Sequence, residues 1–233
     1  TGFFITALIQ SSSASTVMVV SFVNAGLMTL AQSMAVIMGA NVGTTFTAWV
    51  IALFGFKVDI SAFALPLIGL AVPLLFSSKG RTKSIGEFTI GFAFLFMGLD
   101  MISKYVPDLQ SNPEMFAFLQ RYASMGFGSV LIFCFVGMLV TMTIQSSAAM
   151  FAITLIMCSK GWITFDLACA LVLGSNIGTT ITPLLASMSG NVAAKRTAMG
   201  HLLFNFLGTL WTLAVFYPFV ELNSWITREI GQG

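Results

Sequence analysis

Two short polar motifs each occur twice in this chain, inside otherwise apolar stretches. The first reads Gln-Ser-Ser-Ser-Ala at 10–14 and Gln-Ser-Ser-Ala-Ala at 145–149. The second reads Gly-Ala-Asn-Val-Gly-Thr-Thr at 39–45 and Gly-Ser-Asn-Ile-Gly-Thr-Thr at 174–180. Amide and hydroxyl groups can donate hydrogen bonds to an oxyanion, and their oxygens can coordinate a small hard cation. The motifs therefore predict a neutral, hydroxyl-rich site for ions.

Both motifs recur at the same distance, because 145 − 10 and 174 − 39 both equal 135. Residues 2–47 align with 137–182 without a gap and are identical at 16 of 46 positions. Thr47 and Thr182 extend the second motif in both copies. Such a duplication predicts two structural repeats of one kind, which is an organisation typical of membrane transporters.

The composition excludes an ordinary soluble domain. Of the 233 residues, 57% are hydrophobic and only 8% are charged, whereas soluble domains carry about 25% charged residues. The net charge of +2 comes from basic residues in short loops, which does not favour nucleic acid as a partner. Cys134, Cys158 and Cys169 lie in apolar runs and show no disulfide or metal-binding spacing. We expect an all-α, multi-pass integral membrane protein in contact with the lipid bilayer.

The repeated segments predict re-entrant hairpins. Thr1–Ile9 and Thr16–Val23 are too short to cross a membrane, because arms of about 10 residues rise about 15 Å, half the hydrocarbon thickness. A hairpin with the serines at its tip satisfies this length. Phe127–Ile144 and Ala149–Met157 predict the second hairpin, with a longer first arm.

The second motif predicts discontinuous helices. Leu30–Phe56 and Leu167–Met188 are long enough to span, but Asn41–Thr45 and Asn176–Thr180 interrupt them with glycine and with side chains that can bind the backbone. We further expect three ordinary spans, at Ile60–Phe76, Ile85–Val106 and Ala198–Val220. A short interfacial helix is expected at Asn112–Tyr122.

The number of crossings predicts the relation between the repeats. Three spans lie between the two hairpins, and an odd number makes the second repeat enter from the opposite side, as an inverted repeat. We therefore expect a single transmembrane transport domain over 1–233. Repeat 1 is expected over about 1–56 and repeat 2 over about 126–188. Connecting helices are expected over about 57–125, and a final span over about 194–220.

The expected helix ends explain which ions such a site would hold. Free N–H groups at a helix N-terminus favour an anion, whereas free carbonyls and Gln, Asn, Ser and Thr oxygens favour Na⁺. A bound cation would also offset the desolvation of the anion, which no Lys or Arg in these motifs can do. Cotransport is therefore favoured over transport of the anion alone.

These motifs resemble those of the type II sodium/phosphate cotransporter family. A third matching element is Gly-His-Leu-Leu-Phe-Asn at 200–205, similar to the family's His-x-x-Phe-Asn stretch. The resemblance implies inward symport of inorganic phosphate with sodium across the cell membrane, by alternating access. It implies no enzymatic activity and no cofactor beyond sodium ions as co-substrate. A homodimer stays open, because the sequence does not determine the oligomeric state.

The resemblance also implies site residues, all within the repeated motifs. For phosphate they are Gln10, Ser11, Ser12, Ser13, Asn41, Thr44, Thr45, Ser146, Ser147 and Asn176. For sodium they are Gln145, Ser146, Ser147, Thr179, Thr180, Thr182, Gln10 and Thr47. Ala148 replaces the hydroxyl that Ser13 carries, so the two halves cannot bind identically.

Three polar residues outside the repeats have less direct interpretations. His201 is expected to pack between helices or to lie at the interface rather than to bind substrate. Asp100 is expected at headgroup level beside Lys104, rather than as an intramembrane coupling acid. Asn205 is expected to bond a broken helix.

Three alternatives to phosphate symport stay open on the sequence. One is a sodium-coupled carrier of another small anion, such as a dicarboxylate. Another is an intramembrane serine hydrolase that uses His201, although the chain has no Gly-x-Ser-x-Gly elbow. The third is a membrane scaffold that transports nothing.

Overall fold

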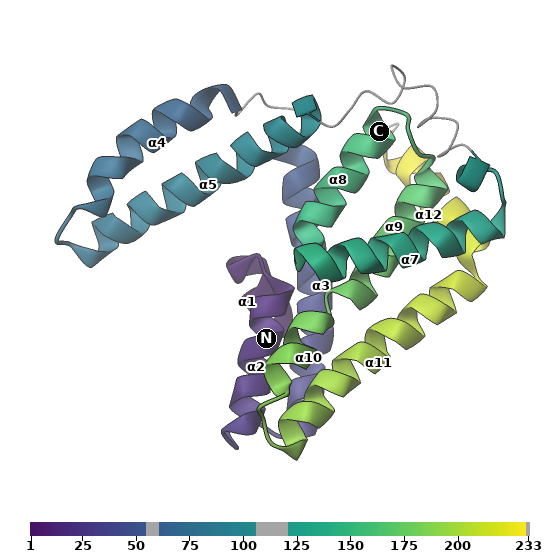
Figure 1. The fold of residues 1–233 in the computed structure, drawn as a ribbon, viewed down its shortest axis with the longest axis horizontal. Helices are drawn as coiled ribbons and strands as arrows, with labels where there is room; N and C mark the ends of the chain where they lie inside the picture. The colour runs from purple at the N-terminus through teal and green to yellow at the C-terminus, as the bar shows by residue number, and fades with distance from the viewer. Residues whose placement is uncertain (55–60, 106–120, 232–233) are drawn as a thin grey trace. The chain divides into compact units, whose positions relative to one another are not determined.

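The computed structural model describes residues 1–54, 61–105 and 121–231, and all regular secondary structure in these ranges is helical (Figure 1). The chain divides into two compact units, one formed by 1–48 with 117–233 and the other by 49–116. The helices are α1 (Gly2–Ile9), α2 (Ser12–Asn24), α3 (Leu30–Phe54), α4 (Ser61–Leu75), α5 (Gly80–Tyr105), α7 (Phe127–Ile144), α8 (Ser147–Ser159), α9 (Phe165–Gly178), α10 (Ile181–Ser187), α11 (Val192–Ala214) and α12 (Phe216–Gly231).

The first polar motif forms the tip of a helical hairpin, as the sequence predicts. Gln10 ends α1 in the left-handed conformation, with φ of 59°, and its N–H donates to the Thr6 carbonyl at 2.7 Å. Ser11 is extended, and its Oγ accepts the Ala14 N–H at 3.2 Å as the N-cap of α2. One left-handed residue followed by one capping serine therefore reverses the chain within two residues.

The second hairpin repeats this tip geometry closely, with the same two backbone conformations and the same cap bonds. Gln145 is left-handed with φ of 56°, and its N–H donates to the Thr141 carbonyl at 2.7 Å. Ser146 caps α8 by accepting the Ala149 N–H at 3.2 Å. α2 and α8 have equal bounds at the offset of 135, and glycines with positive φ follow both, at Gly26 and Gly161. The duplication in sequence is therefore a duplication in structure.

The predicted break in the first repeat is wrong. α3 runs without interruption through Asn41–Thr45, whereas its counterpart stops at Gly178 and resumes at Ile181 as α10. The difference lies one turn later, where repeat 2 has Pro183 and repeat 1 has Ala48. Proline has no N–H for the carbonyl four residues earlier, at Thr179, and its ring displaces that carbonyl. Proline, rather than the polar motif, thus divides the second helix.

The motif glycines instead allow helices to approach closely. A Cβ on Gly43 would lie 2.7 Å from the Phe3 carbonyl oxygen of α1, and a Cβ on Gly178 would lie 2.6 Å from the Met138 oxygen of α7. Both distances are too short for real atoms. Each long helix therefore packs its glycine face against the first arm of its own hairpin, and the hairpin tip is held beside the second motif.

α11 connects the two repeats through a polar stripe. Thr197 lies 3.3 Å from Ser33 of α3, Oγ to Oγ, and Asn205 accepts from Asn41 of α3 at 2.8 Å. Farther along, Thr209 donates to a carbonyl of α9 at 3.4 Å. The sequence predicts a bond from Asn205 to a broken helix, but Asn205 bonds α3, which is unbroken. α2, α10 and the start of α11 pack side by side in this unit.

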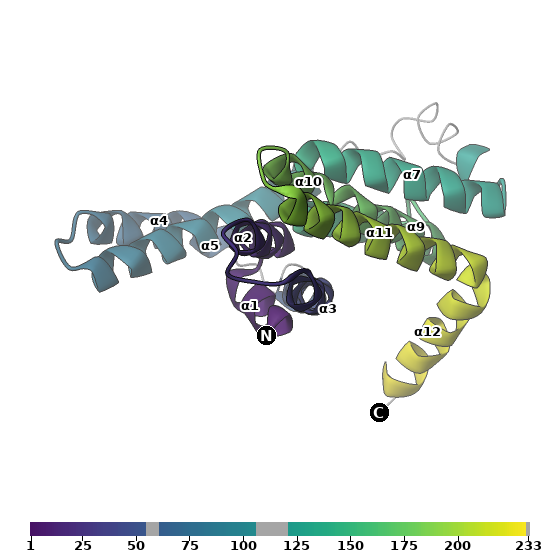
Figure 2. The same ribbon diagram turned by 90° about the horizontal axis from the view of Figure 1, so that it is seen from below.

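The final apolar segment is not the single span 198–220 that the sequence predicts. α11 ends at Ala214, and α12 leaves it at an angle of 84° (Figure 2). Three helices are long and apolar enough to cross a membrane, and the bent pair α11 and α12 meets the same criterion only when taken together. The three are Leu30–Ala52, Phe127–Ile144 and Phe165–Ser187, within the described ranges.

The second unit contains α4 and α5, which pack along each other (Figure 1). They largely cover the predicted spans Ile60–Phe76 and Ile85–Val106, but over the described residues neither helix is both long and apolar enough to cross a membrane by itself. In α5, Asp100 and Lys104 form an ion pair of 2.8 Å one helical turn apart. The predicted interfacial helix Asn112–Tyr122 lies outside the described residues except for its last two positions.

Candidate functional site

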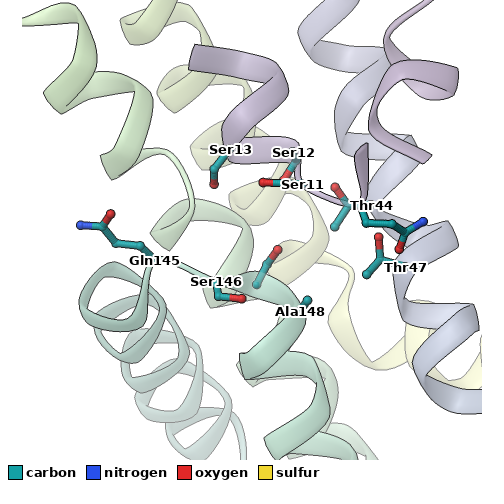
Figure 3. Close-up of a pocket in the computed structure, with 10 residues that line it drawn as sticks. Ser11, Ser12, Ser13, Thr44, Thr47, Gln145, Ser146 and Ala148 are labelled. Carbon is teal, nitrogen blue, oxygen red and sulfur yellow. The ribbon is translucent and has the colours of Figure 1, made fainter. Parts of the chain in front are cut away.

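Both hairpin tips line one small cavity. Its volume is about 50 Å³. Ser11, Ser12 and Ser13 lie on one side, and Ser146 and Ala148 lie on the other (Figure 3). α3 contributes two threonines from the second motif and the turn after it. The lining residues are Gln10, Ser11, Ser12, Ser13, Thr44, Thr47, Gln145, Ser146, Ser147 and Ala148.

Two helix N-termini point their free donors at this cavity. The first N–H groups of α2 and α8 have no carbonyl partner within their own helix, and the helix dipoles place partial positive charge there. Ser11 and Ser146 each cap one donor of their helix, at 3.2 Å. The remaining donors of the first turns, with the hydroxyls of Ser12 and Ser13, form a cradle suited to an anion.

The cavity is neutral. Among the residues that the structure describes, no Asp, Glu, Lys, Arg or His lines it. An anion with one or two full charges would therefore be held by partial charges alone, unless a cation accompanies it. Burying an uncompensated charge costs several kcal/mol or more, so a companion cation is physically favoured.

The cavity is also small. A volume of about 50 Å³ leaves room for a few water-sized groups between the two tips.

The structure brings together nine of the residues predicted to bind ions and leaves six outside the cavity lining. Those in the lining are Gln10, Ser11, Ser12, Ser13, Thr44, Thr47, Gln145, Ser146 and Ser147. Those outside it are Asn41, Thr45, Asn176, Thr179, Thr180 and Thr182.

Four of the six residues outside the lining bond within the protein. Asn41 donates to Asn205, and the hydroxyls of Thr45, Thr179 and Thr180 each donate to a carbonyl three residues earlier in the chain, at 2.7–2.8 Å. Thr182 differs, because its Oγ is buried and has no hydrogen-bond partner. Thr182 follows the break between α9 and α10, where Pro183 leaves the Thr179 carbonyl without its helical donor.

Comparison with known protein families supports what this geometry suggests. A family model described as Na+/Pi-cotransporter matches residues 1–104 and 112–219. The chain belongs to this family. No solved structure matches the chain.

Three relatives show how far this cotransporter family membership extends. "Uncharacterized protein YqeW" of Bacillus subtilis is 36% identical over 97% of this chain and 69% of that protein. "Putative inorganic phosphate export protein YjbB" of Escherichia coli is 33% identical over 95% of this chain, which spans only 38% of that protein. Human "Sodium-dependent phosphate transport protein 2B" is 48% identical over 52 residues, 22% of this chain and 8% of that protein.

Sequence reasoning missed the hydroxyls that lie behind the tips of this cotransporter-family fold. Thr6 donates to Ser15 at 3.0 Å, and both side chains are buried. In repeat 2 the counterpart of Ser15 is Met150, so Thr141, the counterpart of Thr6, keeps a buried hydroxyl without a partner. The signal was present, because Thr6 and Thr141 are identical in the repeat alignment.

His201 does not take part in the cavity. Its side chain is buried in α11, neither ring nitrogen has a hydrogen-bond partner, and it is absent from the cavity lining. A serine nucleophile would need His201 within hydrogen-bond reach as its base. The packing role expected for His201 agrees with this burial. Within the described ranges, no group of three or more His, Cys, Asp or Glu could hold a metal ion.

Proposed function

We propose that this chain is the transport unit of a sodium-coupled symporter of inorganic phosphate that works by alternating access. The observation that carries the proposal is the neutral, hydroxyl-lined cavity between two helix N-termini. Membership of the Na+/Pi-cotransporter family supports phosphate as the anion and sodium as the cation. We place this unit in the cell membrane, as a single transport domain.

Phosphate would bind between the two tips. Ser12 and Ser13 offer hydroxyls from α2, and Ser147 offers one from α8. The free N–H groups of both first turns would donate to the remaining phosphate oxygens. Ala148 offers no hydroxyl, so the α2 side would make more of the side-chain contacts.

Sodium would bind on the side of repeat 2. The unpartnered Thr182 hydroxyl, the Thr179 carbonyl at the helix break and the Gln145 amide oxygen are oxygen ligands of the kind that hard cations take. Repeat 1 has no such break, because Ala48 stands where Pro183 does. Its oxygens in Gln10 and Thr47 would contribute less, and we expect the strongest sodium site in repeat 2.

Alternating access would follow from an inverted arrangement of the repeats. Two observations support inversion: the hairpins share one backbone geometry, and their tips meet at one cavity rather than lying apart. Two hairpins that enter from opposite leaflets would meet tip to tip near the midplane. Rocking one repeat against the other would then open the cavity to each side in turn.

The deciding experiment is radiolabelled phosphate uptake into proteoliposomes with and without a sodium gradient. We expect uptake that follows an inward sodium gradient, and efflux from loaded vesicles when the gradient is reversed, because a symporter is reversible. Measuring both directions matters because the name of the Escherichia coli relative specifies export. Phosphate movement that ignores sodium in both directions would refute the coupling. Succinate competition tests the dicarboxylate alternative, and we expect none.

Substitution in repeat 2 should separate sodium binding from folding. We expect Gln145→Ala and Thr182→Ala to raise the sodium concentration needed for half-maximal uptake severalfold, because each removes a side-chain oxygen offered to the cation. Thermal unfolding in detergent serves as the control for folding, and we expect a smaller change there. If vesicles that carry both substitutions keep the sodium activation of the parent protein, the assignment of the sodium site fails.

A further inference from the structure

The last helix separates its side chains into apolar and polar faces. Phe219, Leu222 and Ile226 follow each other at spacings of three and four, so they form one stripe along α12. Glu221, Ser224 and Arg228 follow the same spacing on the opposite side. The stripe of Phe219, Leu222 and Ile226 is exposed, with 40–52% of each side chain accessible.

A third face of α12 fastens its first turn to the rest of the unit. Phe216 and Val220 are buried to 2% and 5% exposure and belong to the same apolar cluster as residues of α7 and α9. The ring of Tyr217 lies 6.3 Å from that of Phe127 at the start of α7. The first turn of α12 is therefore packed against its own unit. The exposed stripe lies on a different face of the helix and does not contribute to that core.

α12 begins where a helix of membrane-spanning length ends. The 23 residues of α11 rise about 34 Å, enough to cross a hydrocarbon core of about 30 Å. α11 falls short of a fully apolar span because its polar stripe faces α3 and α9, where Thr197, Asn205 and Thr209 have protein partners. Its far end carries Lys195 and Arg196, and its last turn carries Trp211, 71% exposed.

The direction of α12 relative to α11, together with the aromatic residues of both helices, indicates that lipid covers the exposed stripe of α12. A turn of 84° from a helix that crosses the bilayer makes α12 run nearly parallel to the membrane plane. Trp211 and Tyr217 lie within one turn of this bend and Trp225 lies farther along α12, and these residue types collect at the level of the lipid headgroups. The apolar stripe of α12 thus continues the lipid-facing surface of α11, while its opposite stripe carries charge.

We propose that α12 is an interfacial helix whose Phe219–Leu222–Ile226 stripe is inserted at the boundary between lipid headgroups and acyl chains. The partner is the bilayer surface itself. Glu221 balances Arg228 on the polar stripe, and Glu229 adds a negative charge near the end of the helix, so attraction to anionic lipid is not part of the interaction. The last helix then holds the end of α11 at one membrane surface and does not cross. This inference needs the chain to lie in a bilayer, but it does not depend on phosphate or sodium.

Spin labels at single cysteines test this placement in phosphatidylcholine vesicles. The three native cysteines are first replaced by Ala, and labels are placed at Leu222 and Ile226 on the apolar stripe, and at Glu221 and Arg228 on the polar stripe. A label at Leu207, exposed midway along α11, marks the depth of a spanning helix. Collision with dioxygen and with a water-soluble nickel chelate then reports depth.

We expect Leu222 and Ile226 to lie at equal, shallow depth, with a dioxygen-to-nickel accessibility ratio severalfold above that of Glu221 and Arg228. Leu207 should lie deeper than all four. Depth that changes steadily from Glu221 to Arg228 would make α12 the second half of a broken span. Labels on both stripes shielded from both reagents would indicate a protein contact. Either result overturns the proposal. Size-exclusion behaviour of each labelled protein confirms folding before measurement.

Discussion

At the scale of single residues, the two halves of the chain differ where a hydroxyl is lost. Ser13 and Ser15 in repeat 1 become Ala148 and Met150 in repeat 2. The first loss removes a hydroxyl from the cavity, and the second leaves the Thr141 hydroxyl buried without a partner. In repeat 1 the buried Thr6 hydroxyl donates to Ser15, whereas repeat 2 keeps the buried hydroxyls of Thr141 and Thr182 without partners. This asymmetry is the physical basis for assigning sodium to repeat 2.

The amide pair Asn41 and Asn205 gives a prediction at this scale. The pair joins α3 to α11 at 2.8 Å in a partly buried position, and Asn205 also donates to the His201 carbonyl. Hydrogen bonds between membrane helices contribute about 0.6 kcal/mol on average and up to about 1.7. We expect Asn41→Ala and Asn205→Ala to lower thermal stability, and the double variant to lose less than the sum. Strictly additive losses in detergent unfolding would mean that the two amides do not interact.

At the scale of elements, glycine and proline decide how each repeat packs. Gly43 and Gly178 let a long helix lie against the first arm of its hairpin, since a Cβ would approach a carbonyl oxygen to 2.6–2.7 Å. Pro183 then breaks the second long helix and not the first. Glycine in a membrane helix thus sets the distance between helices, whereas proline decides where backbone groups become free.

A matched pair of glycine substitutions tests the packing role. Gly43→Ala should lower stability by about 1–3 kcal/mol, because the added methyl group forces α1 and α3 apart. Gly208→Ala in α11 meets nothing within 4 Å and should be neutral or raise stability by up to about 1 kcal/mol. Thermal unfolding in detergent measures both. Equal effects of the two variants would show that close approach does not explain Gly43.

The break at Pro183 predicts a separate effect on coupling. Pro183→Ala restores an N–H opposite the Thr179 carbonyl, so α9 and α10 can join into one helix as α3 does. We expect stability that is unchanged or raised, together with weaker sodium activation of phosphate uptake. The reverse change, Ala48→Pro, should destabilise α3 and serves as the matched variant. If Pro183→Ala keeps full sodium activation of phosphate uptake, the helix break between α9 and α10 is not needed for cation binding.

At the scale of the whole molecule, inversion of the repeats is the claim on which alternating access depends. Thr29 and Thr164 precede the long helices of the two repeats, are both exposed and are identical in the repeat alignment. If the repeats are inverted, these two positions lie on opposite sides of the membrane. A parallel duplication would place them on the same side.

Cysteine labelling from one side tests this directly. In a background without native cysteines, Thr29→Cys and Thr164→Cys are each exposed to a membrane-impermeant maleimide in sealed, oriented vesicles. We expect one of them to react before the vesicles are opened and the other only afterwards. Reaction of both from the same side would end the inverted-repeat account, whichever ions the cavity binds.

The amino-acid sequence by itself determined the membrane class, the two repeats, the hairpin tips and the bounds of α7, because these follow from composition, duplication and arm length. It also contained most of the cavity residues, since nine of those predicted to bind ions line one space. Apolar periodicity could not reveal the bend after Ala214, because apolar side chains continue through it. Pro218 marks the bend, since its ring displaces the carbonyl four residues earlier, at Ala214, and Phe216 and Val220 then anchor the first turn of α12.

Tertiary structure alone decided which polar groups face the cavity and which bond within the protein. Asn41 and Ser12 look equally suited to an ion in the sequence, yet a partner 164 residues away takes the amide of Asn41. Hydrogen-bonding capacity is a local property of a side chain, whereas its satisfaction depends on neighbours that only the packed helices bring together.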